Sequence, residues 1–138
     1  MIHLYDRQKM KNKLIIALSA IIVGLLSFIL MNQRNEIGFT DWMTGEEYQK
    51  AFDERSKTLY PVVVEAKEAG NDEILYRAYY TELPAGAFWF WSNHGIPTNA
   101  FEENKEKRKR DGFTLVYHQA LNTNEGQTIH QATWAKQK

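Results

Sequence analysis

The chain has 138 residues, with 17 Lys or Arg and 17 Asp or Glu, so its formal net charge is zero. It contains no cysteine, which excludes disulfides, thiol nucleophiles and thiolate metal ligands. Residues 1–34 hold five of the basic side chains and one acidic one, so the remainder is mildly acidic, which argues against general nucleic-acid binding. The length suffices for one small domain beside a membrane segment.

An uncharged apolar segment at residues 14–31 is the first element in chain order. As a helix it would be about 27 Å long, close to the hydrocarbon thickness of a bilayer. Four basic side chains lie within residues 7–13, so the positive-inside rule places residues 1–13 in the cytoplasm and residues 35–138 outside. We therefore expect a signal anchor that crosses the inner membrane once. A cleaved secretory signal, giving a secreted or periplasmic protein, is the alternative.

Small residues recur at helical spacing within this segment, and such residues let two membrane helices approach closely. They are Ala17, Ala20, Gly24 and Ser27. This face predicts packing against another transmembrane helix, as in an accessory subunit of a larger membrane assembly. A stripe that faces lipid and has no partner is the alternative.

After a polar linker at residues 32–41, the sequence predicts a helix followed by two strands. Thr44 and Glu47 have the spacing of a capping box, and Tyr48 and Phe52 repeat at helical spacing behind it. A cluster with glycine and asparagine separates two runs rich in β-branched and aromatic residues, as in a hairpin. The expected elements are a helix at residues 45–58, strands at 60–66 and 74–80, and a third apolar run at 88–91.

The same order of elements returns in the second half. Thr98 is the expected cap of a second helix, and Gly112 follows the end of that helix. The expected elements are a helix at residues 99–111 and strands at 113–120 and 128–134. A shift of 53 residues places Tyr48 on Phe101 and Tyr60 on Phe113, and one extra residue in the second turn then places Ala78 on Ala132.

Two internal copies are the simplest description of this pattern. We predict an α+β fold in which one transmembrane helix precedes a domain at residues 42–138. That domain consists of two helix–strand–strand repeats sharing an antiparallel sheet, repeat 1 at about 42–91 and repeat 2 at about 92–138.

The sequences of the two copies resemble the bacterial tandem repeat family, the repeat module of the N-terminal region of polyglycine hydrolase-like proteins, and the second copy is the more divergent. The matching residues are Met43, Thr44, Tyr48, Gln49, Phe52, Asp53, Tyr60, Ala78, His94 and Gly95. The resemblance implies a repeat module with a binding role and transfers no activity.

Histidines are the only candidates for acid–base or metal chemistry that the sequence singles out. His118 and His130 lie on successive predicted strands and could face each other across the hairpin, but no third ligand has metal spacing. His94 precedes a predicted helix, where its ring can hydrogen-bond to the backbone. We expect no metal, no cofactor and no catalytic residue.

Basic and aromatic side chains supply the expected contact surface. A run of cations at residues 105–110 falls at the carboxyl end of the second predicted helix, where the helix dipole favours positive charge. Exposed aromatic side chains beside it would form a recognition surface. The predicted binding residues are Tyr80, Trp91, His94, Lys105, Lys107, Arg108, Lys109 and Arg110.

Together these features predict a membrane-anchored extracytoplasmic binding module of the bacterial envelope, without catalysis of its own. The expected partners are the bilayer and another envelope or membrane protein, or a second copy of the chain, and no nucleic acid. The alternatives are an accessory subunit of a membrane assembly and a small envelope hydrolase that uses His94 or the pair His118 and His130.

Overall fold

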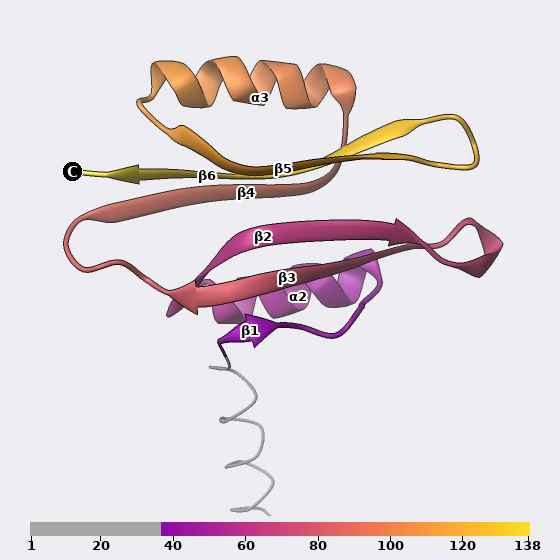
Figure 1. The fold of residues 1–138 in the computed structure, drawn as a ribbon, viewed down its shortest axis with the longest axis horizontal. Coiled ribbons are helices and arrows are strands. Elements are labelled where there is room, and N and C mark those ends of the chain that lie inside the picture. Colours follow the sequence, from indigo (N-terminus) through magenta and orange to yellow (C-terminus); the bar gives the residue numbers. More distant parts are fainter. Residues whose placement is uncertain (1–36) are drawn as a thin grey trace, which may run out of the picture. The chain divides into compact units, whose positions relative to one another are not determined.

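The computed structural model describes residues 37–138, which form two strand–helix–strand–strand repeats (Figure 1). The first repeat consists of β1 (Gly38–Phe39), α2 (Gly45–Arg55), β2 (Leu59–Glu68), the short 3-10 helix η1 (Gly70–Asp72) and β3 (Ile74–Glu82). The second repeat consists of β4 (Phe88–Pro97), α3 (Thr98–Arg110), β5 (Thr114–Asn122) and β6 (Thr128–Gln137).

Each repeat has its own three-stranded antiparallel sheet, in the order β1-β3-β2 in the first and β4-β6-β5 in the second. The single shared sheet predicted from the sequence is therefore wrong. The apolar run at residues 88–91 belongs to β4 and pairs with β6, so it opens the second repeat. Phe88 and Phe90 of β4 contact Tyr60 of the first repeat, whereas Trp89 and Trp91 on the other face are 48% and 44% exposed.

The two hairpins match residue by residue at a shift of 54. Pro61 pairs with Tyr80 and Leu115 pairs with Trp134, and a bulge follows directly in both hairpins. The extra residue of the second copy thus lies between helix and strand, not in the turn as the sequence comparison placed it. An error of one residue reverses the face on which each side chain of a strand lies, so this correction decides which positions are equivalent.

No helix among residues 37–138 is long and apolar enough to cross a membrane. The fold class with one transmembrane helix, the signal anchor and the inner-membrane location with an extracytoplasmic domain are corrected on this finding. The predicted spanning segment at residues 14–31 lies outside the described residues, as does its small-residue face of Ala17, Ala20, Gly24 and Ser27.

The helix ends follow from local side-chain chemistry. The predicted capping box of α2 is confirmed: the Thr44 hydroxyl accepts the Glu47 N–H, and the Glu47 carboxylate accepts the Thr44 N–H at 3.0 Å. The predicted cap of α3 is wrong, because Pro97 is the N-cap residue and Thr98 is the first residue of the helix. Gly112 follows α3 with a φ of +80°, the left-handed conformation that glycine adopts after a helix.

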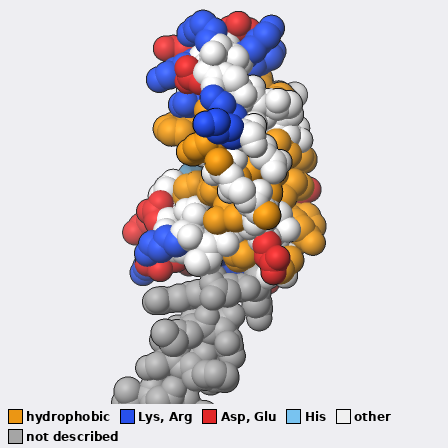
Figure 2. All heavy atoms as spheres, turned by 90° about the vertical axis from the view of Figure 1, so that its left-hand side faces the viewer, with side chains coloured by type: hydrophobic (Ala, Val, Ile, Leu, Met, Phe, Trp, Pro, Cys, Tyr) orange, Lys and Arg blue, Asp and Glu red, His pale blue; other side chains and the backbone are white. Residues whose placement is uncertain are grey.

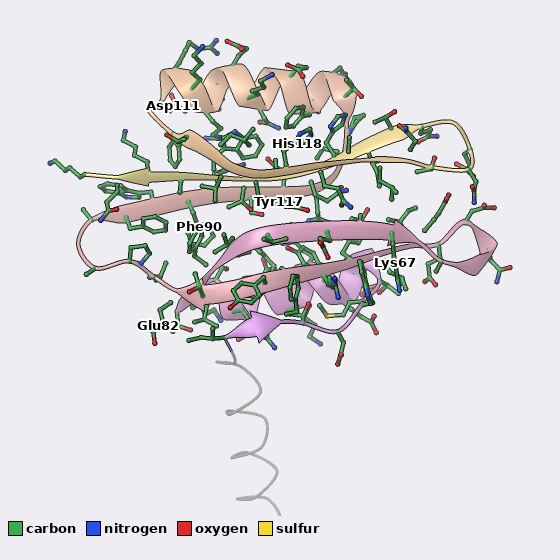
Figure 3. The ribbon with its side chains drawn as sticks, viewed as in Figure 1. Lys67, Glu82, Phe90, Asp111, Tyr117 and His118 are labelled. Carbon is green, nitrogen blue, oxygen red and sulfur yellow. The ribbon has the colours of Figure 1, made fainter. Side chains whose placement is uncertain are left out.

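Each helix covers one face of its own sheet, and the first repeat covers the other face of the second sheet (Figure 1). β2 contacts all three strands of the second sheet. Aromatic rings fill this junction, with Tyr60 at 4.9 Å from Phe88 and Phe52 at 6.5 Å from Phe90, measured between ring centroids. Figure 3 shows Phe90 on the side of β4 that is turned toward the first repeat.

Two glutamines link the repeats through the backbone. The side-chain oxygen of Gln119 accepts the Ala66 N–H at 2.7 Å, and its amide nitrogen donates to the Ala66 carbonyl at 3.2 Å. The fully buried Gln131 donates to Gln119 and accepts the Gly95 N–H at 3.0 Å. Because a buried amide is costly unless it is paired, this network favours one register of β2 on the second sheet.

Candidate binding site

Tyr80, one of the predicted contact residues, lies in the core of the first repeat with no exposed surface. Burial raises the pKa of its hydroxyl to about 12. The residue faces α2 because the even-numbered side chains of β3 point to the helix, so it cannot contact a partner. Its prediction as a binding residue is corrected on this ground.

His94 lies in the junction between the repeats. Its ring is half-buried and stands edge-on to two tyrosines, with centroid distances of 4.6 Å to Tyr48 and 4.9 Å to Tyr76. Desolvation lowers the pKa of the imidazole. These contacts give His94 a packing role, so the structure does not place it on the proposed contact surface.

Trp91 and Arg108 lie together on the α3 side of the second sheet. The Arg108 guanidinium carbon is 3.8 Å from the centroid of the Trp91 ring, and Arg108 is 8% exposed while Trp91 is 44% exposed. Arg108 also approaches the Asp111 carboxylate at 3.6 Å. The guanidinium therefore holds α3 on the sheet, and the outer part of the indole ring is left free for contact.

The remaining cations of the predicted run lie on the solvent side of α3. Lys107, Lys109 and Arg110 are exposed, and Lys105 forms an exposed ion pair with Glu102 at 3.3 Å. In Figure 2, which looks at the end of the fold where α3 finishes, blue side chains with red ones among them gather over the helix, and hydrophobic side chains lie below them.

A pocket of about 560 Å³ opens beside this end of α3. It is lined by Trp89, Asp111, Phe113, Lys136 and Lys138. Trp89 is 48% exposed, and it shares a face of β4 with Trp91 because side chains two residues apart on a strand point the same way. The Lys136 ammonium donates to the Asp111 carbonyl at 2.8 Å and lies 5.8 Å from the Phe113 ring centroid.

The sequence prediction missed Phe113, Lys136 and Lys138 as binding residues. They come from the start of β5 and the end of β6, which meet at the end of α3 only once the second sheet has formed. The repeated tryptophans at positions 89 and 91 were the available signal, because their spacing of two places both on one face of a strand.

Hydrophobic and cationic groups dominate this surface. Lys107, Lys109 and Arg110 are exposed near the end of α3, Lys138 lines the pocket with Trp89, and Asp111 supplies the side-chain carboxylate of the pocket. Asp111 is already paired with Arg108. Such a surface can bind an apolar group between Trp89 and Phe113 and hold negative charges at its rim.

The structure brings His118 and His130 together, as the sequence allowed. His118 Nε2 and His130 Nδ1 are 2.9 Å apart, and His130 Nε2 is 2.9 Å from the Thr98 hydroxyl. Both rings stack on Phe101, so their shared plane is fixed. Desolvation, followed by the nearby His130 and Lys105, lowers the pKa of His118. Figure 3 shows His118 on the α3 side of β5 and the adjacent Tyr117 on the opposite side.

Among residues 37–138 no group of three or more His, Asp or Glu side chains is placed to hold a metal ion. The histidine pair lies outside the pocket at the end of α3, whose lining contains no histidine. Its hydrogen bonds join β5, β6 and the first residue of α3.

Comparison with known proteins identifies the repeat. A family model described as "Polyglycine hydrolase-like, structural repeat" matches residues 43–81 and 90–137. One match falls on each repeat, which confirms both the resemblance and the two copies. No curated protein and no solved structure matches the chain.

Proposed function

Because the chain belongs to the polyglycine hydrolase-like structural repeat family, we propose that its two repeats form a binding module without catalytic activity of its own. The family description names a hydrolase, but the matched unit is its structural repeat. The proposed partner is a protein segment that carries carboxylates beside apolar side chains. The contact surface is the α3-end surface, made of Trp89, Trp91, Lys107, Lys109, Arg110, Phe113, Lys136 and Lys138.

The observation that carries the proposal is the pocket in which Trp89 and Phe113 stand beside lysines. An indole left 48% exposed next to a second aromatic ring offers apolar area that binding would remove from water. The half-buried Lys136 is already oriented by the Asp111 carbonyl, so little side-chain entropy is lost when a ligand approaches. The exposed cations around the rim favour an acidic partner and speed its approach.

The lining of the pocket supports binding rather than catalysis. It contains no serine, threonine or histidine, and its single carboxylate lies beside Arg108. General acid–base catalysis needs a group whose pKa is matched to the reaction and which reaches the substrate. The titratable pair His118 and His130 is stacked on Phe101 instead.

Two synthetic peptides that differ only in charge test this proposal on the full chain. One carries Glu and Leu residues, and the other has Gln at each Glu position. We expect tryptophan fluorescence and calorimetry to detect the acidic peptide alone, with affinity that falls as salt is added. Equal binding of both peptides, or binding of neither, would contradict the proposal, as would binding of a sulfated polysaccharide without either peptide.

Matched variants locate the contact. Trp89→Ala should weaken binding by about 1–3 kcal/mol, as expected for an aromatic anchor, and Lys109→Glu should weaken it through charge. Lys50→Glu makes the same change on the exposed side of α2 and should leave affinity unchanged. If Lys50→Glu and Lys109→Glu weaken binding equally, the acidic peptide recognises overall charge and the α3-end surface is not the site.

A further inference from the structure

We propose that copies of this chain associate head to tail, using the geometry that joins the two repeats within one chain. The exposed face of the first sheet of one copy would be covered by the second repeat of the next copy. The residues named for this interface are not among those of the α3-end surface, and the proposal does not depend on the proposed function.

The junction between the two repeats of one chain serves as the template for the proposed contact between two chains. The face of the second sheet that points away from α3 is covered by β2 and α2 of the first repeat. As a result Thr133 and Gln131 on that face have no exposed surface. The structure thus shows directly which part of a repeat covers this face of the next one.

The equivalent face of the first sheet is only partly covered, by side chains of its own such as Arg77, whose guanidinium lies 4.4 Å from the Phe39 ring centroid. Gly38 pairs with Tyr80 as Trp91 pairs with Trp134, so Ile37 corresponds to Phe90, Phe39 to Ser92 and Tyr79 to Thr133. Ile37 and Phe39 are each 52% exposed and Tyr79 is 36% exposed, whereas Thr133 is fully buried. The same backbone face is therefore closed in one repeat and open, with larger apolar side chains, in the other.

The second repeat also has an exposed apolar surface, at the start of β5, and this surface corresponds to the part of the first repeat that is buried in the junction. Pro61 of the first repeat is fully buried at the junction, while its equivalent, Leu115, is 39% exposed. The next residue, Val116, is 40% exposed. Among residues 37–138, the exposed large apolar side chains away from the α3-end surface thus lie mainly on the two surfaces that the template would bring together.

Charge also favours a second copy over a purely apolar occupant. His94 lies between Tyr48 and Tyr76 in the template, and the equivalent of His94 is the exposed Asp41. The equivalents of the two tyrosines are Phe101 and His130, which adjoin His118 and Lys105. In the head-to-tail arrangement a carboxylate of one copy would face imidazoles and an ammonium of the other.

Association of this kind is heterologous, because two different surfaces meet, and it leaves an open surface at each end. Unless the arrangement closes into a ring, it gives a series of oligomers and not a dimer alone. A symmetric dimer through the exposed face of the first sheet would instead bring two copies of Ile37 together.

The absence of native cysteine allows a position-specific test on the full chain. In the template Phe52 lies against Phe90, and the corresponding pair between copies is Lys105 and Ile37. We expect a short bis-maleimide to cross-link a mixture of Ile37→Cys and Lys105→Cys, and neither variant alone. Cross-linking of Ile37→Cys with itself, or no more product in the mixture than with Lys50→Cys in place of Lys105→Cys, would overturn the proposal.

Sedimentation at increasing concentration provides the second readout. The average mass of the unmodified chain should rise beyond that of a dimer, and Phe39→Glu should reduce this rise at least tenfold in apparent affinity. Leu83→Glu changes a side chain that is 40% exposed outside the proposed interface and serves as the control. A constant monomer mass, or an equal effect of both substitutions, would contradict head-to-tail association.

Discussion

The two repeats place different side chains at the same core positions, and they close their cores in different ways. The core of the first repeat contains three tyrosines, and residues of the second repeat complete its burial. The second repeat seals its own core, with His118 stacked over Phe101 and Arg108 over Trp91. The equivalent positions are Tyr48 and Phe101, Tyr76 and His130, and Tyr80 and Trp134. The first repeat thus relies on its neighbour to close its core, whereas the second repeat covers its own core with the polar side chains His118 and Arg108.

Removing one fully buried ring from each core tests whether the two cores are closed equally well. Tyr80 and Trp134 are 0% and 1% exposed, so replacing either by alanine leaves a large cavity. We expect each change to lower the free energy of unfolding by about 3–5 kcal/mol, measured by urea denaturation. Leu83→Ala, at an exposed position, is the control. A markedly smaller loss for Trp134→Ala would mean that the self-sealed core is looser than the covered one.

The polar link between the repeats is the next feature to break. Gln131→Ala would leave the part-buried Gly95 N–H without its acceptor and remove a donor to Gln119, so we expect a loss of about 1–3 kcal/mol in unfolding free energy. A double-mutant cycle with Gln119→Ala should give a clear coupling energy, because the two side chains are bonded to each other. Additive losses would show that each glutamine acts separately.

The loss of stability at acid pH should depend more on His94, in the junction between the repeats, than on His118, which lies outside it. Burial lowers the pKa of His94, and the same cause lowers that of the more exposed His118. Below a pH of about 6.5 the unfolded chain therefore binds more protons than the folded one, and stability falls until the lower folded pKa is passed. Above that pH these groups contribute no slope.

For one histidine the slope cannot exceed about 1.4 kcal/mol per pH unit. We expect His94→Gln to flatten the decline more than His118→Gln, because the His94 ring is enclosed between two tyrosines. Urea unfolding at pH 8, 6.5 and 5 measures the difference. An equal effect of both variants would contradict the expectation that enclosure in the junction makes His94 the more pH-sensitive of the two.

Local patterns could be read from the sequence, whereas the pairing of distant strands could not. The capping box at Thr44 and Glu47 and the glycine after α3 depend on residues a few positions apart, and both are confirmed. The two-copy repeat was also recognisable. The prediction of a single shared sheet was wrong. The aromatic run at residues 88–91 could belong to either repeat by composition, and only its pairing with β6 assigns it to a separate second sheet.

Exposure explains the mixed outcome for the contact residues. Aromatic residues suit both a core and a binding surface, so the sequence could not separate Tyr80, fully buried behind α2, from Trp91, 44% exposed at the end of α3. The basic run was treated as one patch, but helical geometry turns Arg108 inward onto the indole. Lys136 joins the pocket only through the register of β6.

The smallest expected effect concerns Thr44 and Thr98, two threonines that the sequence predicts as helix N-caps. Thr44→Ala removes the side-chain acceptor of the α2 capping box and should cost about 1 kcal/mol, with faster hydrogen exchange at the Glu46 and Glu47 amides. Thr98→Ala removes no cap, because the Thr98 hydroxyl is bonded to His130, and exchange in the first turn of α3 should stay unchanged. Thr44→Asp should restore the cap, since aspartate accepts the same N–H. Equal acceleration of exchange in both helices would mean that the hydroxyl of Thr98 protects α3 after all.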